Sequence, residues 1–406
     1  MMPPPLQVLL LLLARLGHSA ASSLCLPDNG DYCVDRHLLA AGTITVIAHG
    51  QAEDVFWSDG IRPAMLQAAA ELRVPLSFSL FPRDLSKAQI AEQMSAQIRA
   101  AAALPEGAGR PRALVVTVPS GTGVASAVQA AVAAGIAVVG FNAGSDVAEQ
   151  IGLRAYFGQD ESRAGAQAAA EILERMGGGA RRVVFLDLGG SLLSDRFVAF
   201  NRTLAAAGVQ VDFVLTPARL TSRLDDSLAM IDALRVELLA PNCSSPTGAS
   251  CVYDGIMLGG TALLPSLRTF ISSSLCHTKH GAQVPIGVFD YSTSSAAALR
   301  DGFVSFLIDQ QTWLQGYLSA ATAALAATLN ASLAPPLSPE ILHTGPAVVT
   351  PASRLLDGYP EDKWASRRPF RLALLSRAAA ASPPLASGAS QAALDLGGEA
   401  EAAGLP

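Results

Sequence analysis

Short apolar runs alternate with longer segments of helical periodicity in the first half of the chain. Runs rich in Val, Ile and Leu are typical of buried strands, whereas apolar residues recurring every three to four positions indicate helices. Ser86, for example, can cap a helix on which Ile90, Met94 and Ile98 repeat every four residues. The pattern predicts strands at 43–48, 74–81, 113–118 and 137–141, and helices at 58–72, from 86 onward and at 123–134.

The same rhythm recurs in the second half of the chain. A predicted helix ends at three consecutive glycines, Gly177 to Gly179, where a helix commonly stops. The pattern predicts helices at 161–176, 194–207 and 312–329, and strands at 183–188, 209–215, 255–258, 286–289 and 304–308.

The alternation defines the fold class. Unbroken apolar strands separated by helices indicate a parallel sheet that is covered on both faces. About nine such units exceed one ordinary sheet, so we predict an α/β protein with two doubly wound, Rossmann-like lobes. Ligands of such sheets bind beyond the carboxyl ends of the strands, and the residues that follow each strand are therefore the candidates for a site.

Composition narrows the function classes. The chain has 406 residues, 50% of them apolar, and a formal net charge of −6. Because acidic residues outnumber basic ones, we do not expect a nucleic-acid partner. No run reaches the roughly 18 consecutive apolar residues of a membrane-spanning helix.

The two ends of the chain differ from its body. The apolar run from Leu6 to Ala14 has the length of a signal-peptide core, and small residues up to Ala21 suit cleavage there. The alternative is a short apolar extension. We expect residues 1–21 to be a signal peptide, 350–377 a C-terminal extension, and 378–406, which lacks aromatic residues, a disordered tail.

Export would allow disulfides and glycosylation. Cys25 and Cys33 are eight residues apart, as are Cys243 and Cys251, and either pair could close a small loop, with Cys276 left over. Free thiols throughout are the alternative. Glycosylation sequons begin at Asn201, Asn242 and Asn330, which favours a eukaryotic secretory route over coincidence.

Residues after the strands of the first half of the chain suit a polar ligand. Asp54, Phe56 and Trp57 combine a carboxylate with two aromatic rings, as a sugar site does, although the rings can equally be core residues of the next helix. Ser120 lies in a Gly-rich turn that lacks the third glycine of a dinucleotide site, which argues against a dinucleotide. Ser120 can instead line the site of another polar ligand, or the turn can simply precede a helix. Asn142 can donate to and accept from a polyol, or form a turn.

Later strand ends add further candidates. Asp290 ends an apolar strand, where a carboxylate needs a partner, either a bound hydroxyl or the N-terminus of the following helix. Ser194 and Arg196 follow another strand, and Gln310 follows the last one. We find no nucleophile elbow, HExxH motif or P-loop, so the sequence predicts neither an enzyme nor a cofactor.

The order of motifs resembles the type I periplasmic binding proteins, in the ribose/galactose group of sugar receptors of ABC transporters. The resemblance runs from about residue 43 to 349. Its markers, in order, are FWSDGIRPAMLQAAAELRV, QIAEQMSAQI, GIAVVGFNAGSD, FGQDESRAGAQAAAEIL, IGVFDYS, LRDG and FLIDQQTWLQGY.

The resemblance implies two lobes joined by three hinge crossings, with a sugar bound between them. Lobe one would comprise 43–156 and 311–343, and lobe two 157–310 and 344–349, after an N-terminal segment at 22–42. A repressor of the same fold would need an N-terminal helix-turn-helix, and a signal-like segment stands there instead.

Family positions transfer to this chain residue by residue. The aromatic pair that stacks on sugar falls on Phe56 and Trp57 beside Asp54, the hinge-end carboxylate on Asp290 beside Phe289, and the hinge glutamine on Gln310. Ribose receptors have Asp-Arg where this chain has Asn142-Ala143. A second family arginine falls on Ser194, with Arg196 two residues further on. These departures argue against ribose itself.

The sequence therefore predicts an exported, monomeric solute-binding protein that captures a monosaccharide or polyol by lobe closure, with an ABC permease or membrane sensor as partner. The alternative hypothesis is a receptor-like interaction module that kept the fold and lost sugar binding.

Overall fold

The computed structural model describes thirteen stretches of the chain. They are residues 23–25, 33–35, 43–51, 56–72, 74–82, 85–107, 109–119, 121–176, 182–188, 194–216, 253–268, 284–328 and 340–353. The predicted signal peptide and C-terminal tail lie outside these residues, as does most of the predicted C-terminal extension.

Lobe one is built on a six-stranded sheet in the order β13-β7-β6-β5-β3-β4, and all five pairings are parallel. Its strands are β3 (Ile44–Gln51), β4 (Leu76–Phe81), β5 (Ala113–Val116), β6 (Ala137–Phe141), β7 (Ala155–Gln159) and β13 (Glu340–Gly345). Its helices are η1 (Phe56–Ile61), α3 (Arg62–Leu72), α4 (Lys87–Ala103), α5 (Val124–Ala133) and α11 (Thr312–Thr328).

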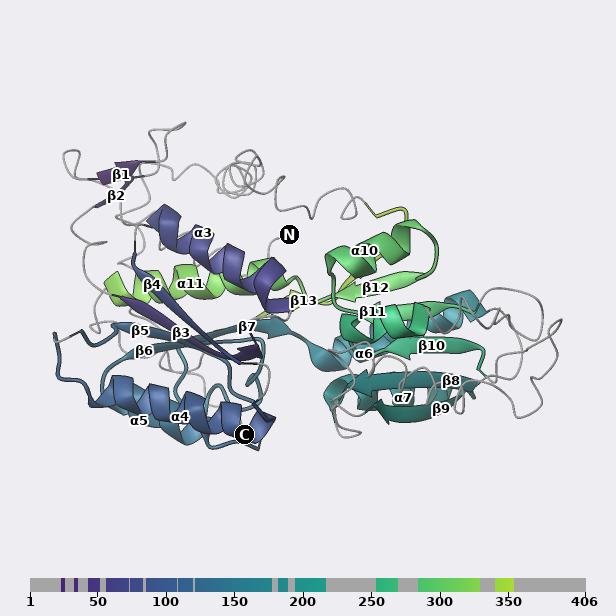
Figure 1. Ribbon diagram of the computed structural model, residues 1–406, viewed down its shortest axis with the longest axis horizontal. Helices are drawn as coiled ribbons and strands as arrows, with labels where there is room; N and C mark the ends of the chain where they lie inside the picture. The colour runs from purple at the N-terminus through teal and green to yellow at the C-terminus, as the bar shows by residue number, and fades with distance from the viewer. Residues whose placement is uncertain are drawn as a thin grey trace, which may run out of the picture.

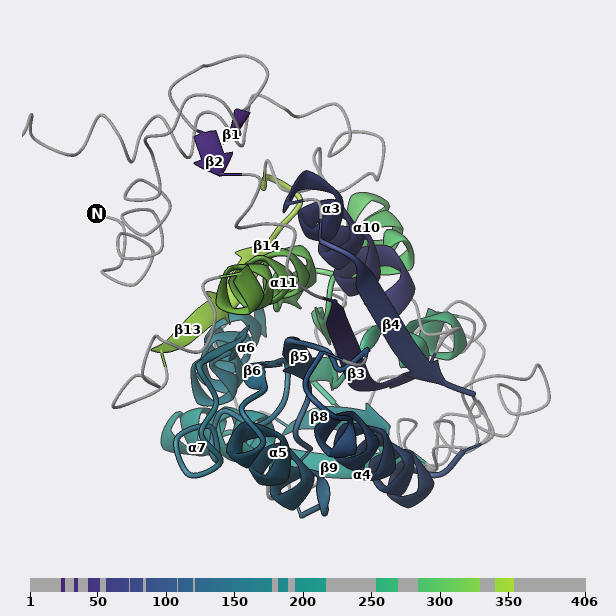
Figure 2. The ribbon, with the colours of Figure 1, turned by 90° about the vertical axis from the view of Figure 1, so that its left-hand side faces the viewer.

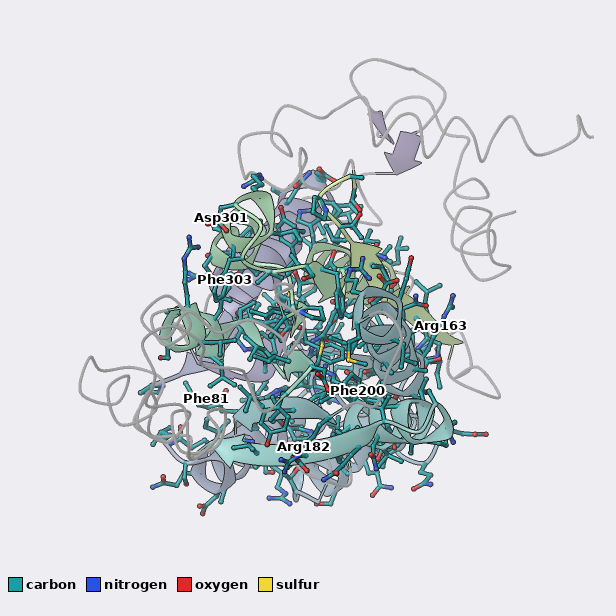
Figure 3. All side chains as sticks on the ribbon, turned by 90° about the vertical axis from the view of Figure 1, so that its right-hand side faces the viewer. Phe81, Arg163, Arg182, Phe200, Asp301 and Phe303 are labelled. Carbon is teal, nitrogen blue, oxygen red and sulfur yellow. The ribbon has the colours of Figure 1, made fainter. Side chains whose placement is uncertain are left out.

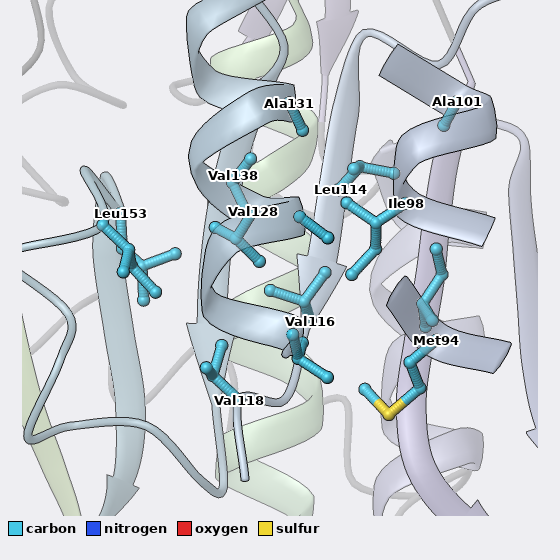
Figure 4. Close-up of a cluster of buried hydrophobic side chains, with 14 of the residues drawn as sticks. Met94, Ile98, Ala101, Leu114, Val116, Val118, Val128, Ala131, Val138 and Leu153 are labelled. Atoms are coloured by element: carbon cyan, nitrogen blue, oxygen red, sulfur yellow. The ribbon is translucent and has the colours of Figure 1, made fainter. Parts of the chain in front are cut away.

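Helices cover both faces of this sheet, as the unbroken apolar strands require. Helices α3 and α11 lie on one face, and α4 and α5 on the other (Figures 1 and 2). On the α4/α5 side, Met94 and Ile98 pack against Leu114 and Val116 of β5 and Val128 of α5 (Figure 4). Helix α4 starts at the predicted N-cap, Ser86, whose hydroxyl accepts from the backbone N–H of Gln89 in a capping box.

Lobe two is built on a second six-stranded sheet in the order β14-β12-β11-β10-β8-β9. Only β14 runs antiparallel to its neighbour. Its strands are β8 (Arg182–Leu188), β9 (Gln210–Thr216), β10 (Gly255–Leu258), β11 (Ile286–Phe289), β12 (Phe306–Asp309) and β14 (Ala347–Val349). Its helices include α6 (Glu161–Met176), α7 (Asp195–Ala206), η3 (Thr261–Leu263) and α10 (Thr293–Arg300).

The interior of lobe two is rich in phenylalanine. Phe185 contacts Phe197, Phe200, Phe213 and Phe289, with ring centroids 5.2 to 6.1 Å apart. Figure 3 views this lobe from its outer end, with Phe200 among the inner side chains and Arg182 at the near edge of the sheet. At that amino-terminal edge, Arg182 Nε lies 2.6 Å from Asp212 Oδ2.

Three segments connect the two lobes among the described residues. They are the step from β7 to α6, the step from β12 to α11, and the step from β13 to β14. The strand pattern predicted most of the two sheets, but it did not identify β7, β13 or β14 as strands. The lobe boundaries inferred from the resemblance stay a prediction.

A small third sheet pairs β1 (Ser23–Cys25) with β2 (Cys33–Asp35) in antiparallel register. In this register the backbones of Cys25 and Cys33 lie directly opposite each other. Directly opposed residues in an antiparallel pair have Cα separations of about 4.5 to 5.5 Å, within the range that a disulfide spans.

Candidate functional site

The carboxyl edges of the two sheets point toward each other. Strand β7 runs into the crossing to lobe two, and the other lobe-one strands are parallel to it. Strand β12 likewise runs into the crossing to lobe one, and β8 to β11 are parallel to it. The carboxyl ends of both sets of strands therefore lie on the hinge side, and we call this region the interlobe edge (Figure 1).

Two aromatic side chains at the lobe-one edge have different environments. Trp57 is 3% exposed, and its ring makes edge contacts with His49, Phe56 and Phe141 at 5.2, 5.2 and 6.0 Å. A Cβ added to Gly50 would overlap the Trp57 ring, so this position needs glycine. Phe56 is only partly buried. Trp57 thus packs in the core, as the alternative interpretation expected, and Phe56 packs against the same core with part of its surface exposed.

The segment 56–72 begins with a π-helix, where the pattern predicted only an α-helix. Phe56 to Ile61 form this wider turn, and Arg62 continues as α-helix. π-turns are rare and occur frequently at functional sites. Here the turn carries Phe56 and Trp57 at the end of the loop that follows β3.

His49 lies at the end of β3 behind these rings. Its Nδ1 is 2.8 Å from Thr117 Oγ1, and Thr117 is fully buried. Burial lowers the pKa of His49 to about 4, and the positive charge of Lys87 adds to this lowering. The imidazole is therefore neutral at pH 7, which suits a supporting hydrogen bond rather than an ionic contact with a ligand.

Backbone geometry at the interlobe edge is unusual. Among the described residues, only Asn142, Asp290 and Gln311 are non-glycine residues with positive φ, at 60°, 76° and 56°. All three follow strands at this edge. Asn and Asp tolerate this conformation better than most residues, and such strain clusters at ligand-binding sites.

Asn142 is joined to the hinge through a residue that the sequence reasoning missed. Its side-chain amide donates to Gln315 Oε1 at 3.3 Å, and Gln315 Nε2 donates to the backbone carbonyl of Gln310 at 3.0 Å. Gln315 is fully buried on α11. A glutamine in an Ala- and Leu-rich helix was the signal available in the sequence, because a buried amide needs polar partners.

Gln310 connects this chain of hydrogen bonds to lobe two. Its Nε2 donates to Asp290 Oδ1 at 2.5 Å, and Thr344 Oγ1 donates to its carbonyl at 2.9 Å. Asp290 does not cap helix α10, because Ser292 occupies that position in a capping box with Ser295. The structure thus brings Asn142, Gln310 and Asp290 into one network that passes through the hinge.

Arg196 occupies the centre of the lobe-two edge. Its Nε and Nη2 donate to the two carboxylate oxygens of Glu161 at 2.6 and 3.0 Å, and its Nη1 donates to the Gly259 carbonyl at 3.2 Å. Its guanidinium lies 4.3 Å above the ring of Phe289, which is fully buried. Phe289 is consequently a platform for Arg196 rather than an exposed surface for a ligand.

The pKa of Arg196 reflects this setting. Burial by itself disfavours the charged form, but Glu161, Asp290 and Asp187 outweigh that effect and raise the pKa above its ordinary value. The guanidinium is fixed in its charged state and held by carboxylates. Ser194 lies beside it as the N-cap of α7, accepting from the backbone N–H of Phe197.

The remaining sequence-predicted residues fall in two groups. Asp54, Ser120, Cys243, Cys251, Asn242 and Asn330 lie outside the described residues. Asn201 is an exposed residue of α7. In the described stretches, no three His, Cys, Asp or Glu side chains gather as metal ligands. The helices that the structure describes are all too short or too polar to cross a membrane.

Two α/β lobes, three crossings and a polar network at facing carboxyl edges define a bilobal binding protein rather than a single-sheet nucleotide-binding domain. Comparison with protein families agrees with this class. A family model described as "Periplasmic binding protein domain" matches residues 44–330. The chain belongs to this family, as its motifs predicted.

Solved structures with the same fold span nearly the whole of their own chains. A carbohydrate transporter from Acidothermus cellulolyticus 11B, in complex with myo-inositol, is 24% identical and has a TM-score of 0.59. The match covers 77% of this chain and 95% of the other. A periplasmic solute-binding protein from Actinobacillus succinogenes 130z with bound D-allose is 16% identical, also at a TM-score of 0.59, with coverages of 76% and 98%.

A sugar-binding protein of a sugar ABC transporter from Bacillus halodurans is 21% identical, with a TM-score of 0.57 and coverages of 78% and 100%. No curated protein matches the chain. At these identities the structural likeness establishes the fold, which agrees with the predicted α/β class.

Proposed function

We propose that this protein captures a small neutral carbohydrate, a monosaccharide or polyol, between its two lobes. The observation that carries the proposal is the network from Asn142 through Gln315 and Gln310 to Asp290, which joins hydrogen-bonding side chains of both lobes. The hydroxyl groups of such a ligand can donate to carboxylate and amide oxygens and accept from amide N–H groups. The structures solved with myo-inositol and D-allose support this ligand class.

Phe56 supplies the apolar part of the proposed site. It is partly exposed, and Trp57 packs against its ring and fixes its position. A sugar ring presents C–H groups on its faces and hydroxyl groups around its edge, so one aromatic ring and a set of polar groups fit it together. Arg196 with Glu161 adds charged groups to the proposed lining, and the sequence candidates Asp54 and Ser120 remain part of the proposal.

We also propose that the protein is exported and acts as a monomeric receptor. The solved structures of transporter-associated periplasmic proteins support export, as do the apolar start of the chain and its sequons. In a bacterium the partner would be an ABC permease; otherwise a membrane sensor would recognise the closed form. The opposed backbones of Cys25 and Cys33 support a disulfide in an oxidising compartment.

A thermal-shift screen against pentoses, hexoses, polyols, inositols and nucleosides tests the proposal. A ligand at 100 times its Kd should stabilise the protein by about 2.7 kcal/mol, which raises Tm by roughly a few degrees. Asp290→Asn tolerates the positive φ of this position but replaces a carboxylate oxygen with an amide. It should lower the affinity for the responding sugar at least tenfold.

Asp301→Asn is the matched control. Asp301 is an exposed residue that directly follows α10, and its carboxylate pairs with Arg268. It lies outside the interlobe edge (Figure 3). It should leave sugar affinity unchanged. A folded protein that responds to no member of the panel would contradict the proposed function and favour the interaction module.

A further inference from the structure

Strand β4 forms one edge of the lobe-one sheet and differs from the other edge strands. Among the described residues it pairs only with β3, and Figure 2 shows it at the margin of the lobe. Charged side chains, bulges and short length normally keep an edge strand from pairing with another chain. Each other edge strand of the two six-stranded sheets has such a feature: β13 contains Glu340 and a register irregularity, β9 contains Asp212, and β14 has three residues. The six residues of β4, LSFSLF, include no charge.

The outer side of β4 presents backbone groups at alternate residues. On the inner side, the N–H of Ile44 in β3 donates to the carbonyl of Pro75 at 2.9 Å, and the register places Ile44 opposite Leu76. In a parallel ladder of this register, the residues before and after Leu76 direct their backbone groups toward β3. The N–H and carbonyl groups of Leu76, Phe78 and Leu80 therefore point away from β3, where they can pair with a further strand.

The sequence of β4 is complementary to itself. Residues 76–80 read LSFSL, which is the same in both directions. When two copies pair in antiparallel orientation around Phe78, Leu76 lies opposite Leu80 of the second copy, and Ser77 lies opposite Ser79 of the second copy. The two leucines and Phe78 are partly exposed and lie on the apolar face of the sheet that α3 and α11 cover. Each apolar side chain thus meets an apolar one, and each serine meets a serine.

We propose that β4 is the interface at which two copies of this chain pair, around a two-fold axis that passes through Phe78. The two lobe-one sheets then form one continuous sheet, with about six backbone hydrogen bonds between the copies. A contact that uses the same strand on both copies closes at two. The inference goes beyond the proposed function, since each copy keeps its own interlobe edge and captures sugar by itself. The monomer that the sequence predicts becomes the dissociated form of this pair.

The pair should be weak and reversible. A stable interface buries about 800 Å² on each partner, and one short strand supplies only part of that area. A two-fold axis perpendicular to the sheet brings helix α3 of both copies to the same face. Leu66 on this helix is 45% exposed and adds apolar surface there. We therefore expect dimers at high protein concentration and single chains at low concentration.

Sedimentation equilibrium over a wide range of concentrations tests the proposal. The average mass of the unaltered protein should rise from one chain toward two. Two charge variants then probe the strand: Ser77→Lys with Ser79→Lys, and Ser77→Glu with Ser79→Glu. Because position 77 of one copy lies opposite position 79 of the other, each variant opposes like charges and should stay a single chain. An equal mixture of the two variants opposes unlike charges and should form dimers again.

Ala205→Lys with Ala206→Lys is the matched control. These two residues are exposed at the end of α7 in lobe two, so the variant gains the same charge away from β4. It should dimerise as the unaltered protein does. The mixture also guards against misfolding, because chains that fail to fold would not regain a specific pairing when they are combined.

Three results would overturn the inference. They are a single-chain mass of the unaltered protein at every concentration, a dimer that persists in both charge variants, and a mixture of the two variants that stays monomeric. None of them bears on the proposed capture of a sugar, which the thermal-shift panel tests separately.

Discussion

At the scale of single residues, His49 should make stability depend on pH. Its pKa is about 4 in the folded protein, against an ordinary value of 6.5 for the unfolded chain. Because the pKa is lowered on folding, the unfolded state binds a proton first, so stability is complete above pH 6.5 and falls as the pH drops toward 4. A pKa difference of one between the two states corresponds to about 1.4 kcal/mol of unfolding free energy. Because His49 is partly exposed, solvent screening reduces the effect, and we expect a loss of about 1–3 kcal/mol.

Urea unfolding at pH 7, 5.5 and 4.5 measures this effect. His49→Asn keeps a polar group near Thr117 but cannot titrate, so its stability should change less over this range than that of the unaltered protein. The exposed His343, changed to Asn, serves as the control and should leave the pH dependence intact. Identical pH profiles for His49→Asn and the unaltered protein would contradict the assignment.

The sequence located candidate residues at the ends of apolar strands, and their roles in binding stay predictions. Asn142, Asp290 and Gln310 were identified from such positions, and the structure joins them in one network. Phe289 and Trp57 were identified in the same way, and the structure buries both. A strand-end position defines where a residue lies, whereas its exposure depends on side chains from distant segments.

At the scale of elements, periodicity predicted the long helices and the central strands well. It missed β7, β13 and β14, which lie at two of the three described crossings. Strand β13 pairs with β7 and β14 with β12, across wide separations in the chain. Such short strands depend on long-range pairing rather than on a local apolar pattern, and no window of sequence contains both partners.

Helices α6 and α7 are held together at a glycine. A Cβ added to Gly165 would overlap the carbonyl of Arg196 and press on the backbone of Phe200. Gly165→Ala should therefore destabilise the protein by about 1–3 kcal/mol, although alanine normally stabilises a helix interior. Because the clash displaces Arg196, sugar affinity should fall as well.

Thermal unfolding and sugar titration measure both effects. Gly123→Ala is the control, since its φ of −72° is ordinary and the nearest atom to the added Cβ is 3.9 Å away. An unchanged or raised Tm for Gly165→Ala would show that the helices can separate without cost.

At the scale of the whole molecule, we expect the three crossings among the described residues to let the lobes move relative to each other. The described crossings are short and join sheets whose carboxyl edges face each other. In hinges of this kind, a few residues at the ends of helices and strands change their backbone dihedral angles as the domains close. Gln311 and Asp290, with their positive φ, lie at or beside the crossing from β12 to α11.

We therefore expect the responding sugar from the screen to make the molecule more compact. Small-angle X-ray scattering should record a smaller radius of gyration with the sugar than without it. Asp290→Asn at the same sugar concentration should keep the larger value, because it binds weakly. An equal radius in both states of the unaltered protein would indicate binding without closure.

The linear sequence was enough to predict the α/β class, the two-lobed plan, the family and the strand ends at which polar residues gather. These follow from local periodicity and from motif order, which a linear chain carries directly. The folded molecule was needed to show that Glu161 occupies Arg196, that Gln315 links Asn142 to the hinge and that Trp57 supports Phe56 from within. Those contacts bring together side chains from separate elements, and their partners are set by packing across the folded molecule.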